Sequence, residues 1–282
     1  MKRIQKIHKG LGRAAFFIGN GVNLSARIMP SWKELLADLA DKTLTIRTEG
    51  LSNTEIYNLI EINSTVAGNF KKKVCTRLTL QVAYNLGVHK RLMQFARETN
   101  SPVLTTNFDT ALSESIGAKL THLDPRGFSR YYPWKSYYGF EKHKLPTDGF
   151  GIWHVHGGIK YPDSIRLGLT DYMGSVEKTR KLLYNGYDSL FRGKRADRWN
   201  GHQTWLHIWF NMPIIMFGFG FGVDEIFLRW LLIERKRLCN QRMEPFELYY
   251  VTKGDPPSGV TNFLTQLGAT IVYVDDFKEI YG

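Results

Sequence analysis

The last third of the chain alternates short, uniformly apolar segments with segments of helical periodicity. The apolar segments cover residues 213–217, 246–251 and 270–274, and the helical ones cover residues 224–239 and 261–267. Strands without polar alternation are typical of a sheet whose two faces are both covered. Their alternation with helices predicts parallel strands joined by helical crossovers. The sequence therefore predicts an α/β fold.

Three further strand candidates precede this region, at residues 13–18, 102–106 and 150–155. Between the first and the second of them, apolar residues recur at helical spacing. We therefore expect one domain over residues 1–282, with a mainly helical insertion at about residues 32–98.

Local patterns add detail to this expectation. Ser31, followed three residues later by Glu34, predicts a capping box at the start of a helix at Trp32. Residues 121–148 mix proline, glycine, aromatic and charged residues without periodicity, which predicts an irregular segment. Helical spacing returns over about residues 170–191.

Cysteine content and apolar runs exclude several classes of protein. The two cysteines, Cys75 and Cys239, are too few for a four-cysteine zinc ribbon or a disulfide scaffold, and they favour a reducing cytoplasm. Residues 1–12 are basic and lack the apolar core of a secretory signal. The longest apolar run, residues 213–223, is too short to span a bilayer. We therefore expect a cytoplasmic protein that has no membrane partner.

The chain is basic, with 38 lysines and arginines against 26 aspartates and glutamates and a formal net charge of +12. Such a charge favours anionic partners, namely a dinucleotide, an acidic protein or nucleic acid. Basic runs lie at residues 2–13, 71–77, 178–181, 192–198 and 235–237. Runs dispersed in this way are typical of solvated helix faces, and nucleic-acid binding stays an alternative. The aromatic segment at residues 131–138 is a lid over a site, an interface or simple loop packing.

Glycine-rich or polar clusters follow four of the predicted strands. Because ligands of open α/β sheets bind at the carboxyl ends of the strands, these clusters are the candidate site. They read Gly19-Asn20-Gly21-Val22-Asn23, Thr105-Thr106-Asn107-Phe108-Asp109, Trp153-His154-Val155-His156-Gly157-Gly158 and Phe217-Gly218-Phe219-Gly220-Phe221-Gly222-Val223-Asp224.

The first and the fourth clusters are rich in glycine. Gly19 and Gly21 allow close approach of the backbone to a diphosphate, although the third glycine of a dinucleotide fingerprint is replaced by Leu24. A tight turn before a helix explains them equally well. The alternating glycines of the fourth cluster also permit backbone contact with a ligand, and we expect Asp224 to cap the helix that follows.

The second and the third clusters carry side chains suited to chemistry. Asn107 can hold a ribose hydroxyl or a water molecule, and Asp109 can either orient its neighbours or cap the next helix. His156 adjoins two glycines, so that a substrate can approach it, and histidine suits proton transfer near neutral pH. His154 is the alternative, since both histidines share one face of the strand. A zinc site is disfavoured, because no third or fourth ligand follows at a familiar spacing.

In this order the four clusters resemble the motifs of the sirtuin-like family, in particular its zinc-free, NAD-consuming branch in bacterial anti-phage defence. That branch has a G-x-G-x-N/S turn, a T-x-N-x-D element, an H-G element and a late G-x-(S/G)-x-x-D element. Leu169-Thr170-Asp171-Tyr172 also looks like the family's segment after the catalytic strand, and the resemblance spans about residues 13–231.

The resemblance implies a Rossmann-like parallel sheet flanked by helices, without a zinc ribbon. It implies hydrolysis of the nicotinamide–ribose bond of NAD, which is a consumed substrate, without a metal. It also implies catalytic roles for His156 as general base, for Asn107 and for Asp109. The NAD-binding residues that it implies are Gly19, Asn20, Gly21, Asn23, Thr106, Gly157, Gly218, Phe219 and Gly220.

Two departures from the family pattern limit what is carried over. Protein-deacylating sirtuins have a four-cysteine zinc module, which a chain with two cysteines cannot form, and their G-A-G-x-S turn is replaced by Gly-Asn-Gly-Val-Asn. An NAD hydrolase that is always active would be toxic, so we expect a separate sensor or activator protein, or assembly into an oligomer. The alternatives are a subunit that binds NAD, ADP-ribose or nucleic acid without turnover, and an NAD-dependent protein deacylase.

Overall fold

The computed structural model describes residues 1–40, 47–64, 70–80, 84–126, 128–193, 198–244 and 246–282. Three segments of the predicted helical insertion, residues 41–46, 65–69 and 81–83, and part of one basic run, residues 194–197, lie outside the described residues.

The described residues form an eight-stranded sheet in the order β3-β4-β5-β2-β1-β6-β7-β8. The strands are β1 (Ala15–Ile18), β2 (Val103–Thr105), β3 (Lys119–His122), β4 (Ser136–Gly139), β5 (Ile152–His154), β6 (Ile214–Phe217), β7 (Leu248–Lys253) and β8 (Ala269–Val274).

Six neighbouring strands of this sheet are parallel, from β5 through β2, β1, β6 and β7 to β8. Numbered by their sequence among themselves, they stand in the order 3-2-1-4-5-6, which is the Rossmann order. The predicted α/β fold with a Rossmann-like sheet is confirmed. The order reverses between β1 and β6, and such a switch point opens a crevice outside the carboxyl ends of the strands.

The sheet also has an antiparallel edge that the sequence did not predict. β3 and β4 pair antiparallel, and β4 pairs antiparallel with β5 at Tyr138 and Ile152. The prediction of an irregular segment over residues 121–148 was therefore wrong in part. Both strands have four residues, and neither is a continuous apolar run, so local composition gave no signal for them.

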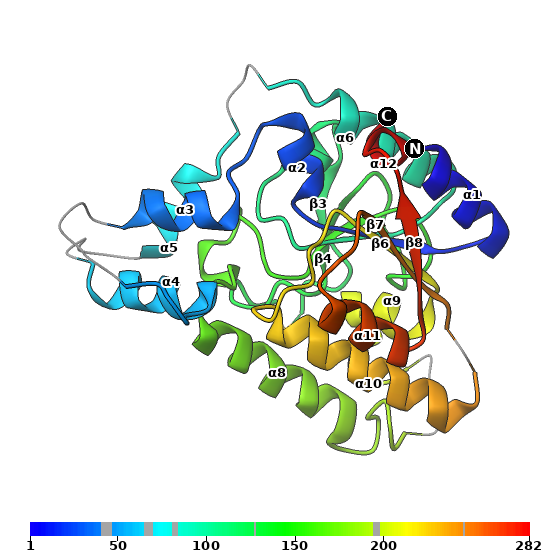
Figure 1. Cartoon of the computed structure of the whole chain (residues 1–282). Coiled ribbons are helices and arrows are strands. Elements are labelled where there is room, and N and C mark those ends of the chain that lie inside the picture. Colours follow the sequence, from blue (N-terminus) through cyan, green and yellow to red (C-terminus); the bar gives the residue numbers. More distant parts are fainter. Residues whose placement is uncertain (41–46, 65–69, 81–83, 127, 194–197, 245) are drawn as a thin grey trace.

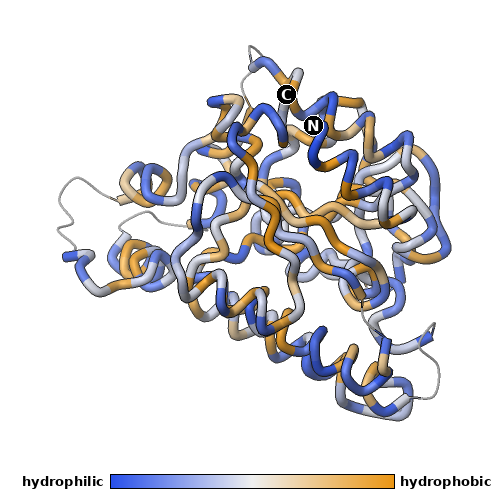
Figure 2. Tube along the Cα trace, turned by 45° about the vertical axis from the view of Figure 1, so that its right-hand side comes forward, coloured by the Kyte–Doolittle hydropathy of each residue, from blue (hydrophilic) through white to orange (hydrophobic). Residues whose placement is uncertain are grey.

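Helices cover both faces of the sheet, as Figure 1 shows. Successive residues of β1 point to opposite faces, so that Phe16 belongs to one buried cluster and Phe17 to the other. This explains the uniformly apolar strands, which run through the middle of the molecule in Figure 2. The Phe16 face packs against α1 (Lys2–Leu11), α6 (Gly87–Glu98) and α12 (Lys278–Tyr281); the Phe17 face packs against α8 (Leu169–Tyr184), α9 (Trp205–Asn211), α10 (Ile226–Arg242) and α11 (Ser258–Gln266).

A third buried cluster belongs to the helices between β1 and β2. It joins α3 (Trp32–Leu39), α4 (Asn53–Ile62) and α5 (Phe70–Arg77), which lie together on the left of Figure 1. The predicted capping box is confirmed, because the Ser31 hydroxyl accepts from the Glu34 N–H and the Glu34 carboxylate accepts from the Ser31 N–H. The remaining short elements are α2 (Gly21–Ala26), α7 (Ala111–Glu114) and the 3-10 helix Pro162–Ser164.

The described helices also bear on membrane insertion. None of those within the ranges given above has both the length and the apolar character that crossing a bilayer requires.

The turns after β1 and β6 touch backbone to backbone. The Gly19 N–H donates to the Phe217 carbonyl at 3.1 Å, and the Gly21 N–H donates to the Gly218 carbonyl at 2.8 Å. A Cβ atom added at Gly19 would lie 2.3 Å from the Gly218 carbonyl oxygen. No residue with a side chain therefore fits at position 19 unless the two turns separate.

We predict that Gly19→Ala lowers the free energy of unfolding by about 3 kcal/mol, through overpacking of the two turns. Gly10→Ala in α1 is the matched control, because a Cβ there meets nothing within 4 Å. It should leave the stability unchanged or raise it by about 0.5–1 kcal/mol through helix propensity. Urea denaturation measures both, and equal stability of the two variants would contradict the described contact.

Candidate functional site

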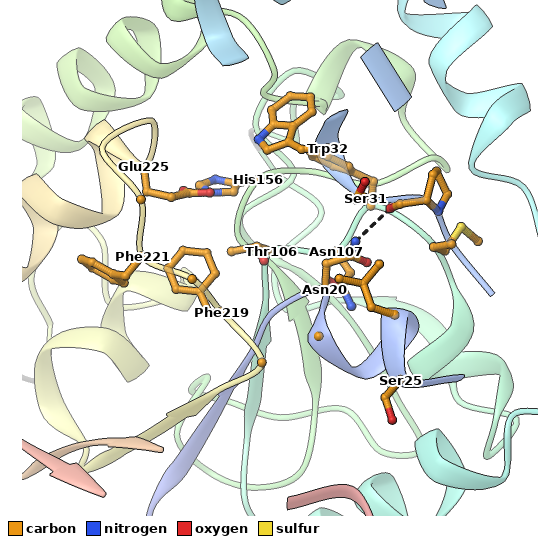
Figure 3. A pocket seen from close by; sticks show the side chains of 18 of the residues that line it. Asn20, Ser25, Ser31, Trp32, Thr106, Asn107, His156, Phe219, Phe221 and Glu225 are labelled. Carbon is orange, nitrogen blue, oxygen red and sulfur yellow. Dashed lines mark hydrogen bonds and ion pairs between the residues drawn. The ribbon is translucent and has the colours of Figure 1, made fainter. Parts of the chain in front are cut away.

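A cavity of about 900 Å³ lies outside the carboxyl ends of the parallel strands, at the switch point between β1 and β6. Figure 3 shows it from close by, with side chains from several strand ends turned toward one space. Nine of the predicted site residues line it: Asn20, Gly21, Thr106, Asn107, Asp109, His156, Gly218, Phe219 and Gly220.

Three predicted site residues, Gly19, Asn23 and Gly157, lie behind this wall. Gly19 packs on the turn after β6, as described above. Gly157 has a φ of 83°, and a Cβ there would lie 2.1 Å from the Ser164 carbonyl oxygen. The side chain of Asn23 is fully buried. These residues shape the site from behind.

Asn107 follows β2 with a fixed backbone and a free side chain. Its N–H donates to the Thr105 hydroxyl at 3.1 Å, and its carbonyl accepts from Nδ1 of His154 at 2.6 Å. The residue is 5% exposed, and neither Oδ1 nor Nδ2 has a hydrogen-bond partner among the described residues. Because buried amides are normally satisfied, this unpartnered amide in a cavity wall is available to a ligand or a water molecule.

His154 and His156, the two histidines of the third cluster, differ in position: only His156 lines the cavity. His154 is not among the lining residues; its Nδ1 carries the proton that the Asn107 carbonyl accepts, and burial lowers its pKa. A neutral ring in this place fixes the backbone of Asn107. His156 lines the cavity, so that of the two only His156 is placed to meet a ligand there.

His156 is buried and bonded on one side. Its Nε2 lies 3.0 Å from Oε2 of Glu225, and its ring meets that of Tyr172 edge to face at 5.2 Å. An ionised carboxylate only accepts hydrogen bonds, so Nε2 carries the proton of the neutral ring. Nδ1 then holds the lone pair, and no described residue bonds to it. Glu225 stands beside His156 in Figure 3.

Asp109 holds the first turn in place. Its Oδ1 accepts from the Ala111 N–H at 2.9 Å, and its Oδ2 accepts from Nδ2 of Asn23 at 2.7 Å. Burial raises the pKa of the Asp109 carboxyl group. Oδ1 of Asn23 in turn accepts from Nε2 of His89 on α6 at 2.8 Å. Both carboxylate oxygens of Asp109 are thus engaged, which is typical of a residue that positions its neighbours.

Asn20 lines the cavity with its amide group fixed. Its Oδ1 accepts from Nδ2 of Asn23 at 2.9 Å, and its Nδ2 donates to the Pro30 carbonyl at 3.0 Å, the bond drawn as a dashed line in Figure 3. Because both amide atoms of Asn20 are already bonded, a ligand would contact other atoms of this turn. Contact with the Asn20 amide would require it to give up its bond to Asn23 or to Pro30.

Asp224 does not cap the helix after β6, so this expectation was wrong. Its carboxylate accepts from the N–H of Asn53 at 3.1 Å and from Nδ2 of Asn53 at 2.7 Å, at the first residue of α4. The N-cap position of α10 is Glu225, whose side chain makes no capping bond. The loop after β6 is thereby attached to the helical insertion.

Two residues of the site were missed by sequence reasoning. Glu225 belongs to no motif, and only the folded chain brings it to His156. Tyr281 comes from α12; it lines the cavity, and its hydroxyl lies against Gly21 and Gly218 without a partner among the described residues. No local pattern marks either residue.

The charged side chains that line the cavity are of both signs. Among the described lining residues, Arg27 and Lys253 are the lysine and arginine side chains, and both are exposed. The three lining carboxylates, Asp109, Asp224 and Glu225, each have a hydrogen-bonding partner. Within the part of the chain that the structure describes, no group of three or more His, Cys, Asp or Glu residues is arranged to hold a metal ion.

In comparisons with known proteins, no protein-family model and no curated protein matches this chain. The resemblance of its motifs to the sirtuin-like family stays a prediction.

The two buried asparagines of the site give opposite predictions for stability. Asn107→Ala should keep or raise the free energy of unfolding by about 1 kcal/mol, because it removes a buried amide without partners. Asn23→Ala should lower it by about 2–3 kcal/mol, because three hydrogen bonds are lost at once. Urea denaturation measures the free energy of unfolding of both variants. A larger loss of stability in Asn107→Ala than in Asn23→Ala would contradict the hydrogen bonds described for Asn23.

The buried His89 predicts a loss of stability in acid. Burial lowers its pKa from about 6.5 to about 4, so the unfolded chain takes up this proton at a higher pH than the folded one does. Stability therefore falls as the pH drops from about 6.5 toward 4. Between pH 7 and pH 4.5 the wild type should lose about 2–3 kcal/mol more than His89→Gln, which keeps a donor for Asn23. Equal losses in urea denaturation at the two pH values would contradict this.

Proposed function

We propose that the chain is an NAD glycohydrolase, which cleaves the bond between nicotinamide and ribose to release nicotinamide and ADP-ribose. One observation carries the proposal. The Asn107 amide and Nδ1 of His156 are buried polar groups without partners among the described residues, and both residues line one crevice at the ends of the neighbouring strands β2 and β5.

The place of the crevice in the fold supports a dinucleotide. In this proposal the diphosphate lies along the turns of Gly21 and Gly218, beside the Tyr281 hydroxyl, which has no partner among the described residues. Arg27 and Lys253 supply positive charge along the same cavity. The nicotinamide ribose then extends toward Asn107 and His156, and the adenosine extends toward the end of β7.

In cleavage of the nicotinamide–ribose bond, the main task of the protein is to position the substrate and the attacking water. When the glycosidic bond breaks, its electron pair goes to the pyridine nitrogen, and nicotinamide leaves as a neutral molecule. The ribosyl carbon passes through an oxocarbenium-like state and takes up a water oxygen. In the proposed mechanism Asn107 holds that water or a ribose hydroxyl, and Nδ1 of His156 accepts the proton that the water loses. NAD⁺ and water thus give nicotinamide, ADP-ribose and one proton.

Such an activity depletes the NAD of its own cell, so it has to be gated. We propose that the chain acts in the cytoplasm as an effector of anti-phage defence, held inactive until a separate sensor protein or self-assembly activates it. Full activity of the purified chain as a monomer would overturn the gating part of this proposal.

We predict that the purified chain, at high concentration or together with the product of its neighbouring gene, releases nicotinamide from NAD. His156→Ala and Asn107→Ala should each lower the rate about 10²–10⁴-fold, because each removes a group that acts on the reacting atoms. His122→Ala on the edge strand β3 and Asn63→Ala at the end of α4 are matched controls that lie outside the cavity. Chromatography of nicotinamide and ADP-ribose measures the rate.

The same experiment separates the alternatives. Binding of NAD without nicotinamide release under every condition would make the chain a binding subunit. Nicotinamide release that requires an acylated peptide would make it a deacylase. Normal turnover by both cavity variants would place the reaction elsewhere.

A further inference from the structure

The residue that precedes α10 makes its side-chain contact inside the cavity. Glu225 is the N-cap residue of a helix of 17 residues, yet it makes no capping hydrogen bond. Its carboxylate instead extends to His156. The carboxylate of Glu225 thus contacts a side chain that lies far away in the sequence and lines the same cavity.

The pair of side chains is removed from solvent. The His156 side chain is 2% exposed and that of Glu225 is 14% exposed, with 3.0 Å between Nε2 and Oε2. Charges interact more strongly in such a place than at the surface, because water screens them less. A negative carboxylate at this distance stabilises an imidazolium relative to a neutral imidazole.

The other charged or titratable groups near this pair have partners or are neutral. Tyr172 on α8 contacts the ring edge to face, and burial raises its pKa, so that it stays a neutral phenol. Asp224 bonds to Asn53, and Asp171 on α8 pairs with Lys71 and Arg166. From α10, the apolar Phe227 lies 6.3 Å from the ring, and from the loop after β2, Asp109 bonds to Asn23. Glu225 is the carboxylate bonded to the ring.

We propose that Glu225 is a positioning residue for proton transfer: it keeps the proton of neutral His156 on Nε2 and favours uptake of a second proton at Nδ1. Its role in turnover rests on the proposed function. The water that attacks the ribosyl carbon gives its proton to Nδ1, and the electron pair of that O–H bond stays on the oxygen of ADP-ribose. The ring is then an imidazolium whose Nε2–H still donates to the Glu225 carboxylate. Release of the Nδ1 proton to solvent restores the neutral ring.

The test is the pH dependence of turnover in Glu225→Gln, with Glu225→Asp and Glu177→Gln as comparisons. Glutamine keeps an acceptor for Nε2–H but removes the charge. The acid limb of the rate should therefore move about 1–2 pH units lower, and the plateau should fall roughly 10–100-fold, because the base is weaker. Aspartate should restore part of the wild-type profile. Glu177 is an exposed carboxylate paired with Lys181 on α8, so its variant should keep the wild-type profile.

A second readout does not depend on turnover. Nuclear magnetic resonance of ring-labelled histidine, with the His156 signal assigned from His156→Ala, follows protonation of this ring directly. In Glu225→Gln its pKa should fall by about 1–2 units, and the melting temperature shows that the variant is folded. An unchanged pKa in the folded variant overturns the proposal. A lowered pKa in a chain that never hydrolyses NAD upholds the contact and rejects the proposed function instead.

Discussion

The crossing of two glycine turns is the contact on which the site depends. The turn after β1 donates two backbone hydrogen bonds, from Gly19 and Gly21, to carbonyls at the end of β6 and in the turn after it, and the two turns touch without a side chain between them. This contact closes the floor of the crevice at the point where the strand order reverses. The loops after β2 and β5 rise on one side of it, and β7 and α12 rise on the other. A side chain at the crossing would displace both walls at once.

The two candidate ligand-binding side chains, Asn107 and His156, are each held in place by hydrogen bonds from neighbouring residues. His154 and Thr105 fix the backbone of Asn107, while the amide of Asn107 stays free. Glu225 holds one nitrogen of His156 and leaves the other without a partner. A buried polar group without a partner costs about 1–3 kcal/mol, and a ligand that bonds to it would remove this cost. Engaged and free groups alternate through the site, which is the arrangement that preorganised binding requires.

The sequence predicts those parts of the fold and site that have a local cause. Uniformly apolar runs marked the parallel strands, and the clusters that follow them supplied a large part of the cavity wall, since Asn107 and His156 come two residues after the ends of β2 and β5. What was missed depends on distant partners. β3 and β4 exist because they pair with each other and with β5, and Glu225 matters because folding brings it to His156. The prediction that Asp224 caps the helix after β6 was wrong for the same reason, because its carboxylate bonds to Asn53 on α4.

The loop between β6 and α10 joins two parts of the molecule that the sequence keeps far apart. Asp224 holds the first residue of α4 in the helical insertion, and the next residue, Glu225, holds the ring of His156. Adjacent residues of one chain cannot move independently by more than the length of a peptide unit. The position of the insertion and the environment of His156 are therefore mechanically connected through a single peptide bond.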